Sequence, residues 1–286
     1  MKDRYENLDE YIADLRAALS QNDGCANHHY NLGVALLSKG DFVAAEESFL
    51  AAVRNSSHLA EAYVQLGGIC LQRGDLEGCL RYNEEAANCR AKFPVPWSNI
   101  GFVHLQRGEP EKAISALQKA LKWDAEFIQA MATLGAAYYM NGQYDESIKI
   151  SEKAIEKQPG FAPAWNNLSL AWFEKGDYDK AAEYADKAIE FGFDVRPEYL
   201  EEIAAHRNTY GEGVTGGGSF LQKAPSPGPP PAKCWLVVRL YGRSSCYGKR
   251  FPEYSGNFFY AVARGAQGQW LFCDFSFSLK PPADIR

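Results

Sequence analysis

Residues 162–195 read APAWNNLSLAWFEKGDYDKAAEYADKAIEFGFDV, and the same pattern precedes them four times. The chain superimposes on itself at a shift of 34 residues from Ala26 to Val195 without insertion or deletion. The five copies are 26–59, 60–93, 94–127, 128–161 and 162–195. An unbroken period of this length indicates a solenoid in which each repeat packs on the next.

Equivalent positions in the five copies show what the fold constrains. Apolar residues fall three and four apart in two stretches of about 13 residues, the spacing of one helical face, so each copy is predicted to be an antiparallel helix pair. Position 15 is always glycine, where a positive φ ends a helix at little cost. Position 27 is always alanine, and positions 8 and 20 are small, which predicts close helix packing. The glycines are Gly40, Gly74, Gly108, Gly142 and Gly176, and the alanines are Ala52, Ala86, Ala120, Ala154 and Ala188.

Two segments carry a family resemblance. Residues 97–104, WSNIGFVH, and 165–172, WNNLSLAW, with GDYDKA at 176–181, resemble the tetratricopeptide repeat pattern. The family's proline near the end of each repeat is present only at Pro159. The resemblance implies an all-α, right-handed superhelical solenoid of helix-turn-helix repeats that acts as a scaffold. It also implies that positions 2, 5, 6, 9, 12 and 13 of each first helix face a concave groove.

The flanks extend this organisation. We expect residues 1–25 to form an N-terminal capping helix, equivalent to half a repeat, and residues 196–210 to form a C-terminal capping helix that begins near Pro197. Residues 211–232 are a Gly/Pro-rich linker. Residues 233–286 read as a small β-like or unfolded tail, in which apolar stretches beginning at 235, 258 and 270 could form a three-stranded meander. The alternative is an extension never selected to fold, arising from read-through or a frame shift.

Charge and composition exclude several classes of protein. The formal net charge is −6, with nine Lys/Arg and four Asp/Glu in residues 211–286, so the tail is +5 and the remainder −11. The basic excess is scattered, which argues against a nucleic-acid partner. The N-terminal segment is charged throughout and no run is apolar enough for a membrane span, so we expect a cytoplasmic protein with no membrane partner. Seven cysteines, an odd number, favour reduced thiols.

The groove positions supply the candidate binding site. Position 6 forms a ladder of mostly primary amides, each of which can donate and accept a hydrogen bond to a peptide backbone. The alternative is that these amides merely follow the repeat pattern. Apolar and aromatic residues beside the ladder would add affinity. The candidate residues are Asn31, Gln65, Asn99, Thr133 and Asn167 at position 6, Tyr30 and Asn166 at position 5, Phe102 at position 9, and Leu105, Tyr139 and Phe173 at position 12. We expect Asn99 and Asn167 to be exposed in the free protein.

The charge of these positions predicts the kind of partner. None of the thirty groove positions carries Lys or Arg, whereas family members that grip a terminal carboxylate use basic residues there. The predicted partner is therefore an extended, neutral or mildly basic, partly apolar segment, or a helix, of another protein. Self-association, with the groove accepting a helix or tail of another copy, is the alternative. A third hypothesis places an enzymatic activity in the tail.

Nothing in the sequence favours catalysis or a cofactor. Cys25, His28 and His29 lie together, but they are too few to predict a zinc site. Cys70 and Cys79 fall at inward-facing positions, where buried thiols act as small hydrophobic groups. No nucleophile–base arrangement stands out from the repeat pattern. We therefore expect a non-enzymatic protein without a metal or cofactor.

Overall fold

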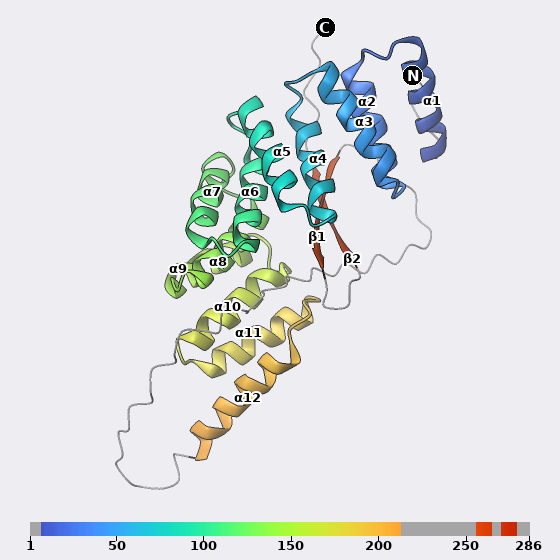
Figure 1. Ribbon diagram of the computed structural model, residues 1–286. Coiled ribbons are helices and arrows are strands. Elements are labelled where there is room, and N and C mark those ends of the chain that lie inside the picture. The colour runs from blue at the N-terminus through green and yellow to red at the C-terminus, as the bar shows by residue number, and fades with distance from the viewer. Residues whose placement is uncertain (1–6, 213–255, 265–269, 279–286) are drawn as a thin grey trace.

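A computed structural model describes residues 7–212, 256–264 and 270–278. Figure 1 shows an elongated stack of helices that follow one another in chain order. Every element from Leu8 to Glu212 is a helix, which confirms the all-α solenoid. The helices are α1 (Leu8–Gln21), α2 (Ala26–Ser38), α3 (Phe42–Asn55), α4 (Ala60–Gln72), α5 (Leu76–Cys89), α6 (Pro94–Gln106), α7 (Pro110–Trp123), α8 (Ile128–Met140), α9 (Tyr144–Lys157), α10 (Ala162–Glu174), α11 (Tyr178–Glu190) and α12 (Pro197–Glu212).

The turn within each repeat has the predicted chemistry. All five position-15 glycines have positive φ, between 72° and 81°, so the expected left-handed helix ends are confirmed. A sixth, Gly192, follows α11 with φ 88° and was not predicted. Three second helices then begin at an aspartate whose side chain accepts a hydrogen bond from the helix backbone: Asp41 from Ala44, Asp75 from Gly78 and Asp177 from Lys180.

The seam between the two helices of a repeat is closely packed. All five position-27 alanines are fully buried. A Cβ atom added to a position-8 glycine would come too close to the side chain at position 24: 2.5 Å from Leu117 at Gly101, and 2.7 Å from Phe49 at Gly33. The fifth copy reverses the sizes, with Ser169 at position 8 and Ala185 at position 24. The side chain at position 24 therefore requires glycine at position 8 opposite it.

Both ends of the stack are covered. Ile12 and Leu15 of α1 are buried in the core of the first repeat. At the other end, Tyr199 and Ile203 of α12 are buried against α11, and the Tyr199 hydroxyl lies 2.8 Å from Ser169 Oγ. Helix α12 runs to Glu212, two residues beyond the predicted end.

A two-stranded antiparallel hairpin follows in the tail. Strand β1 (Gly256–Arg264) pairs with β2 (Trp270–Ser278), with Phe259 opposite Phe275. Strand β1 lies against α4 (Figure 1). Most of the predicted linker and the first stretch of the predicted meander, at 235–241, lie outside the described residues.

Candidate functional site

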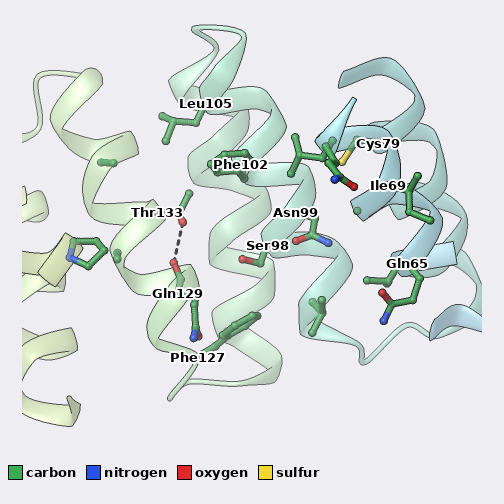
Figure 2. A pocket seen from close by; sticks show the side chains of 18 of the residues that line it. Gln65, Ile69, Cys79, Ser98, Asn99, Phe102, Leu105, Phe127, Gln129 and Thr133 are labelled. Atoms are coloured by element: carbon green, nitrogen blue, oxygen red, sulfur yellow. Dashed lines mark hydrogen bonds between the residues drawn. The ribbon is translucent and has the colours of Figure 1, made fainter. Parts of the chain in front are cut away.

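The first helices of neighbouring repeats, chiefly α4, α6 and α8, line an open groove of about 1210 Å³, including space open to solvent. Figure 2 shows its side chains along these helices. Its apolar lining is Leu37, Phe42, Val64, Gly68, Ile69, Leu71, Cys79, Val95, Phe102, Leu105, Phe127, Ala132, Ala136, Phe161 and Pro163. Its polar lining is Gln65, Gln72, Ser98, Asn99, Gln129, Thr133 and Asn167. Within the described part of the chain, no charged side chain lines it.

Six of the candidate residues meet in this groove. Most of the lining comes from the first-helix positions expected to face it. Because residues three and four apart share a helix face, one stripe from each first helix reaches the same surface. The six are Gln65, Asn99, Phe102, Leu105, Thr133 and Asn167.

Some amides of the position-6 ladder are hydrogen-bonded to other groups of the protein. The side chain of Asn167 is only 4% exposed, and its Nδ2 donates to the Ala132 carbonyl at 2.8 Å. This bond ties α10 to α8, so the expectation that Asn167 is exposed is wrong. Asn99 is half-buried, and its Nδ2 donates to Asn83 Oδ1 at 2.9 Å, so the expectation that Asn99 is exposed is wrong as well. In Figure 2, Thr133 Oγ1 donates to the carbonyl of Gln129, at 2.8 Å. The bonds of Asn167 and Asn99 join different helices and help to set their spacing, whereas the Thr133 bond lies within α8.

Two candidates at the N-terminal end lie outside the groove lining. Tyr30 packs against Phe49 with ring centroids 5.7 Å apart. Burial raises the pKa of the Tyr30 hydroxyl to about 12, and a hydrogen bond with Gln65 opposes this rise. Asn31 is half-buried beside it. The tyrosine is thus neutral at physiological pH and acts as part of the core.

Three candidates at the C-terminal end are also outside the lining. Asn166 is 6% exposed. The Tyr139 hydroxyl donates to Glu174 at 3.1 Å, and burial, with the nearby Glu174 charge, raises its pKa. Phe173 packs against Tyr199 of α12 with ring centroids 5.4 Å apart. Helix α12 therefore covers this end of the first-helix face.

The structure adds aromatic residues that the first-helix pattern missed. Phe127 and Phe161, which immediately precede α8 and α10, line the groove, as does Phe42 at the start of α3. Position 34, the last of each copy, is apolar throughout: Leu59, Phe93, Phe127, Phe161 and Val195. This recurrence was the signal that could have identified Phe127 and Phe161.

The cysteines and histidines singled out in the sequence lie in packed or hydrogen-bonded positions. Cys70 and Cys79 are free and buried, and burial raises their thiol pKa values to about 11 and about 12. Since the thiolate is the reactive form, both act as small apolar groups at neutral pH. His29 Nε2 lies 2.7 Å from the Asp23 carbonyl oxygen. In the described ranges no group of three or more His, Cys, Asp or Glu could hold a metal ion, and none of the described helices could cross a membrane.

Several solved structures share the fold. MamA is 26% identical, with 56% of this chain and 94% of that chain covered and a TM-score of 0.50. YrrB is described as a tetratricopeptide repeat protein with an unusual peptide-binding site. It is 22% identical, with 68% of this chain and 97% of that chain covered and a TM-score of 0.54. PilF of Pseudomonas aeruginosa is 19% identical, with 70% of this chain and 90% of that chain covered and a TM-score of 0.60. The last two similarities show the fold alone.

Family models agree with the repeat pattern. No curated protein sequence matches the chain. Models described as "Tetratricopeptide repeat" match residues 7–60, 104–168 and 162–191. Together with the helix pairs and their glycine turns, these matches show that the chain belongs to the tetratricopeptide repeat family.

Proposed function

We propose that this protein is a non-catalytic scaffold that binds an extended, uncharged, partly apolar segment of another protein in the groove of α4, α6 and α8. The observation that carries the proposal is the lining, which combines apolar and aromatic side chains with amides and hydroxyls and has no charged group in the described residues. A segment bound to such a surface is stabilised by burial of apolar area and by hydrogen bonds between the lining and the amides and carbonyls of the segment's backbone.

The two kinds of lining have separate roles. Phe102, Val95 and Phe161 line the groove and are half-buried, so a partner that covers them buries further apolar surface, which contributes about 25 cal/mol per Å². Gln129 and Asn99, both half-buried, provide polar groups along the same surface for an extended backbone. A charged partner side chain would lose its hydration here without gaining an ion pair, which favours an uncharged segment. YrrB is described as having a peptide-binding site, and the shared fold makes a peptide the first partner class to test.

Peptide selection on the full chain tests this proposal. Peptides are selected from a random display library, and their affinities are measured by calorimetry at low and high salt. Phe102→Ala removes a half-buried groove side chain and should weaken binding about 5- to 30-fold, or about 1–2 kcal/mol. The control Trp123→Ala removes an aromatic side chain that is 40% exposed at the end of α7 and should leave affinity unchanged.

Salt dependence provides a second criterion. Because the groove lining carries no charge in the described residues, affinity should change little between low and high salt. Equal loss of affinity in Phe102→Ala and Trp123→Ala, or binding that collapses with added salt, would contradict the groove mechanism.

Self-association is a second candidate. Strand β1 lies against α4, a helix that lines the groove, so a tail segment and the groove helix can meet. Light scattering over a range of protein concentrations distinguishes the two functions. A scaffold for another protein stays monomeric at all concentrations, whereas self-association through the groove gives larger species that Phe102→Ala dissociates.

A further inference from the structure

Helix α4 contains two consecutive glycines, Gly67 and Gly68, near its centre. Glycine is the poorest helix former after proline, so each glycine in a helix interior calls for a reason. The two have different surroundings. A Cβ atom on Gly67 would lie 2.4 Å from Asn83 Nδ2, so packing against α5 requires glycine there. A Cβ atom on Gly68 would meet no heavy atom of the described residues within 4 Å. Packing therefore explains the first glycine and not the second.

Gly68 lies in the binding groove. One turn before and after it, Gln65 and Leu71 lie on the same face of α4, and both line the groove. Figure 2 shows Gln65 and Ile69 on α4, with Asn99 and Phe102 on the neighbouring α6. The open space at Gly68 is thus part of the groove.

The other repeats fill the equivalent position. Position 9 carries a side chain in the remaining four copies: Val34, Phe102, Ala136 and Leu170. Only the second copy lacks one, which leaves a gap in the row of position-9 side chains. A position that departs from helix preference without a packing reason is a candidate for function.

We propose that Gly68 keeps open a notch that accepts one bulky apolar side chain, such as Leu, Ile, Met or Phe, from the bound segment. The inference rests on the proposed function and names the residue of the partner that gives specificity. Val64, Ile69, Leu71 and Phe102 are apolar lining residues close to the notch in sequence or across the groove. A charged anchor would be desolvated there without a partner, whereas an apolar anchor is stabilised by burial.

Size complementation tests the notch. Peptides selected on the full chain should share one position restricted to bulky apolar residues. Gly68→Leu fills the notch and should weaken these peptides about 10- to 100-fold, without lowering the Tm, because the space is open. Replacing the peptide's anchor with Ala should weaken binding to the wild type. Gly68→Leu should bind this shortened peptide about as well as the wild type does, because the smaller side chain no longer needs the notch.

The outcomes separate this inference from the proposed function. Wild-type affinity in Gly68→Leu, with binding still lost in Phe102→Ala, would overturn the notch and leave the groove mechanism standing. Selected peptides without a restricted apolar position would also overturn the notch. Peptides insensitive to both substitutions would overturn the two proposals together. Self-association that Gly68→Leu abolishes would assign the notch to a second copy of this chain instead.

Discussion

The seam between the helices of each repeat and the groove along the first helices belong to the same helices but are packed differently. At the seam, Ala120 is fully buried, and Gly101 has no room for a Cβ beneath Leu117. In the groove, Phe102 is half-buried and Gly68 has open space around it among the described residues. The helix-packing requirement therefore constrains one face and leaves much of the other to serve binding.

The seam and the groove merge at Asn167. Asn167 lines the groove, yet its side chain is buried and bonded to the preceding first helix. A residue of this kind serves packing, whatever it does in binding. Variants meant to affect binding without affecting folding must therefore leave Asn167 unchanged. The substitutions below measure how strongly positions at the seam and in the groove contribute to stability.

The largest effect is expected at the seam. Ala120→Leu adds volume at a fully buried site in the core that also contains Leu117 and Leu134. Overpacking of this kind should lower the free energy of unfolding by about 1–3 kcal/mol, measured by urea denaturation. The control Ala17→Leu, at an exposed site on α1, should change stability by less than about 0.5 kcal/mol. Equal stability of the two variants would show that position 27 tolerates volume.

An intermediate effect is expected at Asn167. Asn167→Ala removes the donor to the Ala132 carbonyl and leaves that acceptor without this bond. The expected loss of stability is about 1–2 kcal/mol, measured in the same way. Asn31→Ala is the matched control, because it changes the same residue type at the same repeat position, where no earlier repeat precedes it. A similar cost for both would mean that the bond to the neighbouring repeat contributes little.

Much of the fold follows from the repeat period, while the site depends on contacts that the period does not encode. The helix-ending glycines could be predicted because they recur at one position with one backbone requirement. Phe127 was missed because it precedes a helix, so a first-helix pattern excludes it. The burial of Phe173 depends on how α12 docks, which lies outside the repeat. The bond of Asn167 depends on the distance between two first helices, which sequence spacing cannot supply.

The smallest effect, and the one that separates the two faces most sharply, concerns the neighbouring glycines of α4. Gly68→Ala should raise the free energy of unfolding by about 0.5–1 kcal/mol, because alanine favours the helix and its Cβ meets no atom within 4 Å among the described residues. Gly67→Ala gains the same helix preference, but its Cβ would lie 2.4 Å from Asn83 Nδ2, so its net effect should be destabilising. Urea denaturation of both variants measures the difference. Stabilisation by both would mean that Asn83 moves aside easily, and destabilisation by Gly68→Ala would mean that the groove is filled where the notch is proposed.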